Sequence, residues 1–360
     1  MHRLRATSAT LIHLMRRRDT CHNALAVDPR EFPEKGSLAE KMRFFLRYAV
    51  LAPSPFNTQP WRYRVRQDGT VEFFFDRTRR LAALDPNDRL MHVALGSTLK
   101  LFLLVAEAFE YDLETELFPD GLDAELVARV RPSDDAYVTG IGRELLPAVA
   151  QRQTGWGEFA RGDLADHIRA HIRSMLDGMA EIRFEFVTDL IARQELAEIV
   201  GEANRRLFKL DDMRNELADW MRTSRNGATD GLPVEALELG PFRTAATVRK
   251  KPELGERIAE REREHLLNAP LVLVVGTEED KPELWPAVGG AWVVTELIAT
   301  QHHLRSAVVH APLLLREARA QVQESLYDET IVPQQICRFG YAPPLVPEPR
   351  RTLEQGLLLE

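Results

Sequence analysis

A short string in the first fifth of the chain holds the residues best suited to contact a flat polar molecule. Residues 52–61 read Ala-Pro-Ser-Pro-Phe-Asn-Thr-Gln-Pro-Trp. Proline fixes the backbone angle φ, so Pro53 and Pro55 hold Ser54 rigidly between them. Asn57 and the glutamine two residues later offer neutral donors and acceptors that match the edge of a heterocycle. From the residues alone, a rigid turn that places a tryptophan in the core explains the string equally well.

A second group of residues could bind an anion. Arg152, Gln153 and Thr154 lie together before the helical stretches of the second half, and Arg350 and Arg351 lie near the C-terminus. A guanidinium group donates two parallel hydrogen bonds to a phosphate, so arginine suits a phosphate monoester better than lysine does. An arginine and a threonine in a loop are ordinary, however, and a basic tail is commonly solvated. The residues alone therefore leave both interpretations open.

Several other chemistries lack the residues they need. The sequence contains no phosphate loop of the GxGxxG or GxxxxGK[ST] type, no HExxH zinc motif and no GxSxG nucleophile motif. Histidine pairs occur at positions 167/171 and 302/303, but no third ligand pattern accompanies them, so we predict no metal site. His310 stands alone at a strand end, where a structural role is commoner than acid or base catalysis, and we name no catalytic residue.

The composition is that of a globular protein. Of the 360 residues, 44% are hydrophobic and 28% are charged, which allows two domains of ordinary size. A formal net charge of -8 argues against a nucleic-acid partner. Two cysteines, Cys21 and Cys337, are too few for a disulfide framework and fit a reducing cytoplasm. Charged residues interrupt the apolar N-terminal segment, so we predict neither a secretory signal nor a membrane partner.

The periodicity of apolar residues outlines the elements that position these groups. Ser37 and Glu40 form a capping-box pattern in front of an amphipathic helix. Asp68-Gly69 is a strong turn signal between two strand-like runs, which predicts a hairpin. Further predicted segments are helices at residues 91–108, 163–179, 191–208 and 289–304 and strands at residues 113–118, 182–187 and 271–275.

Two of these helices indicate a weak internal repeat. Residues 91–108 and 289–304 are both long and apolar, and Gly96-Ser97 can be laid on Gly290-Ala291. Self-similarity of this kind is typical of a duplicated unit. Any two buried helices share such features, so the helices alone do not decide whether the chain is duplicated.

The string at residues 52–61 resembles a motif of the nitroreductase superfamily, Pro-Ser-Ser-x-Asn-x-Gln-Pro-Trp, which follows an early helix. In that family the serine and asparagine positions contact the flavin mononucleotide (FMN) that belongs to the partner subunit. The resemblance therefore implies an FMN-binding role for Pro53, Ser54, Pro55 and Asn57. Pro55 departs from the second serine of the family pattern.

The residues from 151 to 159 resemble the N-terminal Arg-x-Ser/Thr-x-Arg/Lys pattern of the same family. Its cations and hydroxyl bind the FMN phosphate, which implies that role for the segment Arg152, Gln153 and Thr154. Trp156 stands where the family has its second cation. A hydrogen bond to a charged group is typically worth about 1.5 to 3 kcal/mol, so this departure is expected to weaken the site.

Two segments nearer the C-terminus are also similar to the family. Residues 337–344 resemble the glycine-containing strand at the end of the catalytic domain, which leads to basic residues that reach the same phosphate. Arg350 and Arg351 take that place here. Ala311 follows the second long helix, where family members place backbone that faces the flavin ring.

The order of these motifs implies two nitroreductase-like halves fused in one chain, as in the two-domain, Acg-like branch of the superfamily. We expect an α+β fold in which two pseudo-symmetric halves each carry a mainly antiparallel sheet flanked by helices. The expected parts are an N-terminal extension (1–36), a first half (37–146), a second half (147–353) with a lid-like insertion at about 209–245, and a tail (354–360).

The lid expectation depends on a segment of that branch that can cover the flavin. Residues 220–233 are similar to it and contain Arg222, Asp230 and Gly231. Without the resemblance, a loop of this length and composition is more often a surface excursion.

The resemblance implies an FMN-dependent oxidoreductase of nitroreductase type. Hydride would pass from NAD(P)H through the flavin to a small nitro, quinone or similar acceptor. The alternative is a flavin-binding or flavin-sequestering protein whose lid keeps the nicotinamide out, and a third possibility is an interaction protein whose site has decayed. Because the two halves replace the usual homodimer, we expect a monomer or a weak dimer in the cytoplasm.

Overall fold

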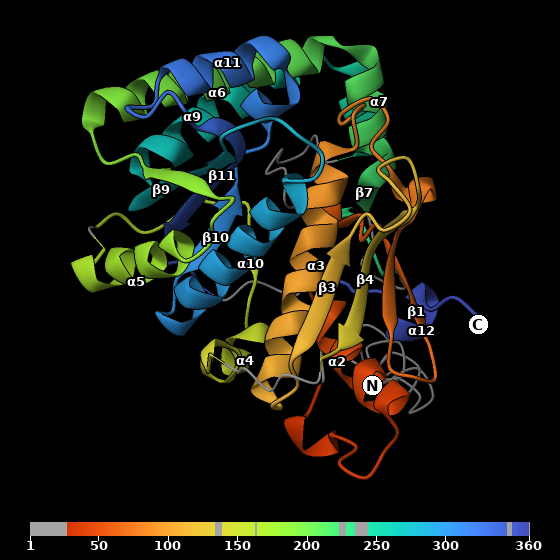
Figure 1. Cartoon of the computed structure of the whole chain (residues 1–360). Helices are drawn as coiled ribbons and strands as arrows, with labels where there is room; N and C mark the ends of the chain where they lie inside the picture. The colour runs from red at the N-terminus through yellow and green to blue at the C-terminus, as the bar shows by residue number, and fades with distance from the viewer. Residues whose placement is uncertain are drawn as a thin grey trace, which may run out of the picture.

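Two β-sheets and two long central helices organise the molecule, and further helices pack around them (Figure 1). The computed structural model describes residues 27–133, 139–162, 164–222, 228–234, 244–343 and 348–359. Its strands are β1 Trp61–Val65, β2 Val71–Phe75, β3 Leu113–Leu117, β4 Leu126–Pro132, β5 Thr154–Gly155, β6 Arg183–Phe186, β7 Met221–Arg222, β8 Leu232–Pro233, β9 Leu271–Thr277, β10 Arg305–Val308 and β11 Val332–Gly340. Its α-helices are α2 Leu38–Ala49, α3 Arg89–Ala108, α4 Ile141–Val149, α5 Asp166–Asp177, α6 Leu190–Lys209, α7 Asp211–Trp220, α8 Ala245–Lys250, α9 Leu254–Asn268, α10 Trp285–Gln301, α11 Arg316–Glu324 and α12 Leu353–Gly356.

The two large sheets share one topology. Along the chain, β1 and β2 precede helix α3 and β3 and β4 follow it, while β6 and β9 precede helix α10 and β10 and β11 follow it. The first sheet has the strand order β1-β2-β4-β3, and the second has the order β6-β9-β11-β10. If the four strands of each unit are numbered in chain order, both sheets read 1-2-4-3, and all neighbouring strands are antiparallel. The fold is therefore α+β with two similar sheet-and-helix units, as the resemblance led us to expect.

Each sheet is extended by a segment that follows the other unit in sequence. Strand β5, which comes after the first unit, pairs in parallel with β10, with Thr154 opposite Ser306. The C-terminal segment returns to the first sheet, where Leu357 forms a parallel bridge with Tyr63 and the Leu358 N–H donates to the Tyr63 carbonyl at 2.7 Å. Helix α12 therefore lies beside β1 in Figure 1. Through these exchanges, the segment that follows each unit in sequence is paired with the sheet of the other unit.

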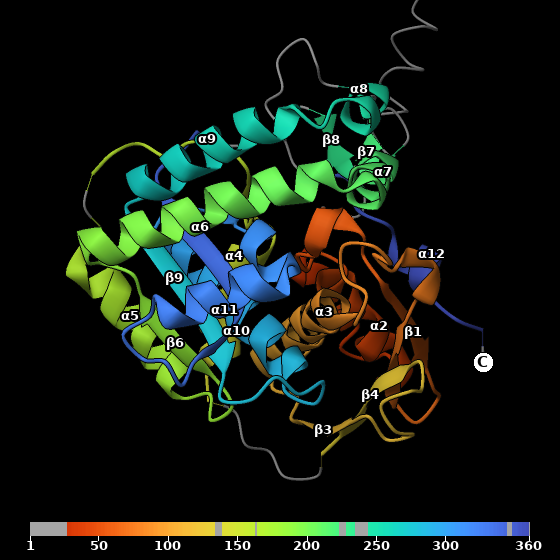
Figure 2. The same cartoon turned by 90° about the horizontal axis from the view of Figure 1, so that it is seen from above.

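The second sheet is covered on both faces. All seven residues of β9 are buried. Its residues Leu271, Leu273 and Val275 share a core with α5 and α10, whereas Val272 and Val274 pack with α6 and α9. Seen from above, α6 and α9 run side by side over this sheet (Figure 2). Burial on both faces explains why β9 is an almost continuous apolar run in the sequence.

Helices α3 and α10 pack closely at the centre of the molecule, and glycine makes the contact possible. A Cβ atom added to Gly289 would lie 1.8 Å from the carbonyl oxygen of Val93. The hydroxyl of Ser97 donates to the Gly289 carbonyl at 3.0 Å.

Helix α3 is long and apolar enough to cross a membrane by length and composition, but 83% of its most apolar window is buried within the fold.

Gly289→Ala is expected to lower the free energy of unfolding by about 1 to 3 kcal/mol, because the new methyl group would force the two backbones apart. Gly290→Ala is the matched control, since its Cβ would meet only the Lys100 side chain at 3.6 Å. Alanine also favours a helix over glycine, so this control should be neutral or stabilising. Urea unfolding of both variants measures the difference, and equal losses would mean that the helices do not pack this closely.

The first described residues pack on the first unit. Phe32 stacks on Phe45, with ring centroids 5.7 Å apart, and lies 4.5 Å from the ring of Phe109. Part of the segment that we predicted to be an N-terminal extension is thus anchored in the core; residues 1–26, with Cys21, lie outside the described residues.

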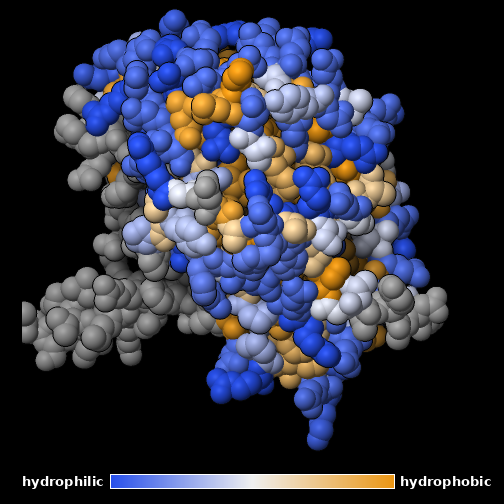
Figure 3. Space-filling model, turned by 90° about the vertical axis from the view of Figure 1, so that its left-hand side faces the viewer, coloured by the Kyte–Doolittle hydropathy of each residue, from blue (hydrophilic) through white to orange (hydrophobic). Residues whose placement is uncertain are grey.

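The surface shown in Figure 3 is mainly hydrophilic, with apolar areas scattered over it. Among the described residues, the large apolar side chains that are more than half exposed include Leu190, Ile191 and Tyr327. Scattered apolar side chains are usual on protein surfaces and do not by themselves mark an interface.

Candidate functional site

The turn between α2 and β1 has an unusual backbone. Phe56, Asn57 and Gln59 adopt positive φ angles of 51°, 53° and 50°. Such angles cost roughly 1 to 3 kcal/mol for a residue other than glycine, and they tend to cluster at functional sites. Within the turn, the Gln59 N–H donates to the Ser54 hydroxyl at 2.9 Å. This hydrogen bond helps to hold the strained turn, in which Phe56 contacts His310 and Asn57 contacts Arg350.

Asn57 lies directly against the C-terminal arginines. Its Nδ2 donates to the Pro349 carbonyl at 2.9 Å, and its Oδ1 accepts a short hydrogen bond from Arg350. Arg351 donates from its backbone N–H to Gln59 Oε1 at 2.8 Å. Burial lowers the pKa of Arg350 to about 10, so this side chain remains positively charged near neutral pH. The structure thus brings together two predicted groups that lie about 290 residues apart.

The segment that we predicted to be a lid lies on the same turn. Of residues 220–233, the structure describes 220–222 and 228–233. Gln59 Nε2 donates to the Thr229 carbonyl at 2.8 Å, and the Gly231 N–H donates to the Asn57 carbonyl at 3.2 Å. Asp230 accepts hydrogen bonds from Arg79 of the first unit and from Arg222.

The carboxylate of Asp230 holds this segment on the asparagine-bearing turn. Burial alone would raise the pKa of Asp230, but the hydrogen bonds from Arg79 and Arg222 outweigh it, and the pKa is lowered. Both guanidinium groups also lie over the ring of Trp220, at 5.4 and 5.6 Å from its centroid. The segment is consequently clamped onto the asparagine-bearing turn by charge and by cation–π contacts.

Arg152 and Thr154 lie at the start of β5 and face a buried carboxylate on α10. Arg152 Nη1 is 2.8 Å from Glu296 Oε2, and its Nη2 donates to the Leu51 carbonyl at 3.0 Å. The hydroxyl of Thr154 donates to Glu296 Oε1 at 2.9 Å, and Ser306 donates to the same oxygen. The positive charge of Arg152 adds to burial in lowering the pKa of Arg350.

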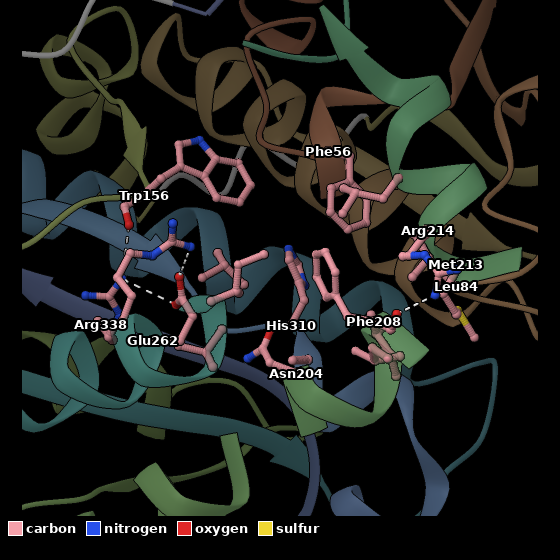
Figure 4. A pocket seen from close by; sticks show the side chains of 18 residues that line it. Phe56, Leu84, Trp156, Asn204, Phe208, Met213, Arg214, Glu262, His310 and Arg338 are labelled. Atoms are coloured by element: carbon pink, nitrogen blue, oxygen red, sulfur yellow. Dashed lines mark hydrogen bonds and ion pairs between the residues drawn. The ribbon is translucent and has the colours of Figure 1, made fainter. Parts of the chain in front are cut away.

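A cavity of about 100 Å³ opens between the two units. Phe56 and Leu84 line it from the first unit, and Trp156, His310 and Ala311 are among the residues that line it from the second. Figure 4 shows His310 between the Arg338 and Glu262 side chains and Phe208, with Trp156 and Phe56 above it in this view. The ring centroids of Phe56 and His310 are 5.7 Å apart.

Among the polar atoms of the side chains that line this cavity, the indole Nε1 of Trp156 and the Nδ1 of His310 are buried and have no hydrogen-bond partner. An unsatisfied buried donor or acceptor is costly, which makes such atoms candidates for contact with a bound molecule. Burial, with a smaller contribution from the charge of Arg89, lowers the pKa of His310 to about 3, so its imidazole is neutral near pH 7.

The predicted site residues thus occupy one region in three neighbouring groups. Asn57 lies with Arg350 and Arg351, Arg152 lies with Thr154, and Ala311 lines the cavity that Phe56 reaches. Pro53, Ser54, Pro55 and Gln153 are adjacent to these in sequence.

Three residues in this region escaped the sequence analysis: Phe56, Glu296 and Ser306. Phe56 was read as part of the turn rather than as a wall of a cavity. A signal existed for Glu296, because it is the single charged residue between Trp285 and Gln301. A lone carboxylate in an otherwise apolar helix requires a buried partner.

The histidine pairs lie together but form no metal site in the described part of the chain. The His302 ring centroid is 5.2 Å from that of His167 and 5.8 Å from that of His171. Among the described residues, no group of three or more His, Cys, Asp or Glu side chains is arranged to hold a metal ion.

Comparison with curated proteins finds relatives over most of the chain. A Mycobacterium tuberculosis protein provisionally named as an NAD(P)H nitroreductase is 26% identical over 339 residues, covering 88% of this chain and 91% of that protein. A second protein of that organism, provisionally named as the NAD(P)H nitroreductase Acg, is 24% identical over 337 residues, covering 90% of this chain and 97% of its own length.

Among solved structures, the FMN-dependent nitroreductase NfnB of Mycobacterium smegmatis, in complex with NADPH, is 20% identical to this chain. The match covers 61% of this chain and 98% of that one, with a TM-score of 0.40. No protein-family model matches the sequence.

Proposed function

We propose that this chain is a member of the nitroreductase superfamily and an FMN-dependent oxidoreductase whose flavin lies between its two halves; similarity over most of its length to the two Mycobacterium tuberculosis proteins supports this. The observation that carries the proposal is the cavity at the boundary of the units, where Trp156 Nε1 and His310 Nδ1 are unpaired beside the ring of Phe56. Apolar walls with a few convergent polar groups are typical of cofactor sites.

The residues present fit the ring and the phosphate of FMN unequally. Phe56, Trp156 and the backbone at Ala311 offer a flat apolar surface for the ring. Arg152 and Arg350 supply positive charge for the phosphate, and Asn57 positions Arg350 through its side-chain oxygen. The cavity of about 100 Å³ is small beside the roughly 300 to 1,000 Å³ of most ligand pockets, so side chains such as Phe56 have to move to admit the ring.

Bound FMN would supply two-electron chemistry, by which hydride from NAD(P)H reaches a nitro, quinone or similar acceptor. The protein contributes binding, orientation and the exclusion of water. A neutral His310 can donate or accept a hydrogen bond without adding charge to the cavity. The chain needs no second copy to complete such a site, which supports a monomer or weak dimer and a division into halves at residues 37–146 and 147–353.

The role of the cavity is tested by two matched tryptophan variants. Trp156→Phe keeps an aromatic ring and removes the unpaired N–H, so we expect the dissociation constant for FMN to rise by roughly two- to tenfold, the value of one neutral hydrogen bond. Trp292→Phe removes another buried, unpaired N–H, from the middle of α10, and should leave binding unchanged. Quenching of flavin fluorescence measures both constants. Equal affinities in the two variants would place the flavin elsewhere.

Flavin sequestration is the second candidate function. It is favoured by the clamp that Asp230 forms with Arg79 and Arg222 over the asparagine-bearing turn. The two functions differ in whether a nicotinamide can reach the flavin. Oxidation of NADH or NADPH in the presence of a quinone or a nitroaromatic compound supports the oxidoreductase, whereas bound yellow flavin that neither nicotinamide reduces supports sequestration. Protein that remains colourless after FMN is added contradicts both.

A further inference from the structure

A carboxylate already occupies the place between the groups proposed to hold the FMN phosphate. Glu296 is 1% exposed and lies on the most buried helix of the second unit. Its two oxygens accept hydrogen bonds from the Arg152 guanidinium at 2.8 Å, from the Thr154 hydroxyl at 2.9 Å and from the Ser306 hydroxyl. Carboxylates and phosphates attract the same donors in the same geometry. Glu296 therefore competes with a phosphate for these groups.

The donors of Arg152 are largely used within the protein. Its Nη1 donates hydrogen bonds to Glu296 and Thr154, and its Nη2 donates to the Leu51 carbonyl. A phosphate that approached this side chain would have to displace Glu296 or share the guanidinium with it. Displacement of Glu296 would leave a buried carboxylate without a positively charged partner. Sharing of the guanidinium would place the carboxylate and the phosphate, both negatively charged, side by side.

The charges of the surrounding side chains also disfavour the binding of a phosphate. Arg152 is paired with Glu296, Arg350 lies 3.3 Å from Glu348, and Arg351 lies 4.0 Å from Asp76. Each of these three arginines therefore has a carboxylate partner, so the three pairs carry no net charge. A phosphate monoester adds a charge near −2, and Trp156 supplies no further cation to offset it.

We propose that Glu296 determines how tightly this site holds the phosphate of its flavin. The carboxylate substitutes for the phosphate in the unliganded protein, so FMN is bound as an exchangeable cofactor and riboflavin, which lacks the phosphate, competes with it on nearly equal terms. This inference rests on the proposed function, because it concerns the selectivity of that same flavin site.

Glu296→Gln tests the proposal, because the amide keeps the size and most hydrogen bonds of the side chain but removes its charge. We expect FMN affinity to rise by about tenfold or more, and riboflavin affinity to change by less than about threefold. Glu72→Gln is the matched control. Glu72 is also a buried carboxylate paired with arginines, Arg64 at 3.2 Å and Arg66 at 3.1 Å, but it lies on the first sheet. This control should leave both affinities unchanged.

The wild-type protein provides an independent measurement that does not depend on how well the variant folds. Its dissociation constants for FMN and riboflavin should agree within about threefold, since the phosphate gains little net interaction. An FMN preference of about a hundredfold in the wild type, unchanged in Glu296→Gln, would overturn the role of Glu296 and leave the flavin site intact. Failure of the wild type and of Glu296→Gln to bind either flavin would instead remove the proposed function itself.

Discussion

Arg152→Ala is expected to lower the free energy of unfolding by about 3 to 5 kcal/mol, the usual cost of breaking a buried ion pair by removing one partner. The side chains of Arg152 and Glu296 are 3% and 1% exposed. Without the guanidinium, Glu296 keeps only the hydroxyl groups of Thr154 and Ser306, which donate hydrogen bonds but carry no charge. Urea unfolding of the purified variant measures the loss.

Two further variants separate this cost from a general effect of losing an arginine. Arg143→Ala removes an arginine of α4 whose pair with Glu110 is about 70% exposed on both sides, and it should leave stability nearly unchanged. Arg152→Met combined with Glu296→Leu should recover most of the loss, because apolar side chains often replace a buried ion pair at no cost. Were Arg152→Ala as stable as Arg143→Ala, the pair would be more exposed to solvent than the structure has it.

Elements with strong local signals were predictable from the sequence. The capping box at Ser37 is present, with the Ser37 N–H donating to Glu40 Oε2 at 2.7 Å, and α2 begins at the next residue. The hairpin around Asp68-Gly69 is formed by β1 and β2. These features depend on residues within a few positions of one another, so the sequence alone carries their physical cause.

Elements that depend on distant partners were missed. No strand was predicted at Leu126–Pro132, yet β4 lies between β2 and β3 in the first sheet, and its pairing with both of them defines it. Helix α9 was also missed, because charged residues fill most of Leu254–Asn268 and only a narrow apolar stripe faces α6. In both cases tertiary contacts outweigh the local pattern.

The candidate site was predictable as a set of positions but not as a set of contacts. The motifs placed Asn57 and Arg350 in one site, and the two side chains are hydrogen-bonded. They gave no hint that Arg152 would be neutralised by Glu296, because the pair joins residues 144 positions apart. The charge balance of a site depends on every side chain that the fold brings to it, so it has to be counted in the structure.

His310 is expected to make the protein sensitive to acid. Burial lowers its pKa to about 3, below the roughly 6.5 of an unfolded histidine, so the unfolded state binds the proton more readily between these values. The stability due to neutral His310 is complete above about pH 6.5 and is lost as the pH falls towards 3. Between pH 7 and pH 4 the loss is about 3 kcal/mol, and His310→Gln should remove this part of the pH dependence.

Urea unfolding of the wild type and His310→Gln at several pH values measures this difference, with His303→Gln as the control at an exposed position. If His310 is buried and neutral, the wild type should lose about 3 kcal/mol more than His310→Gln between pH 7 and pH 4. Parallel curves would contradict its burial. The same unfolding measurements with added flavin test whether the flavin contacts His310. A flavin that donates a hydrogen bond to the unpaired Nδ1 of His310 requires the neutral imidazole, so it should move the acid loss to lower pH in the wild type but not in His310→Gln.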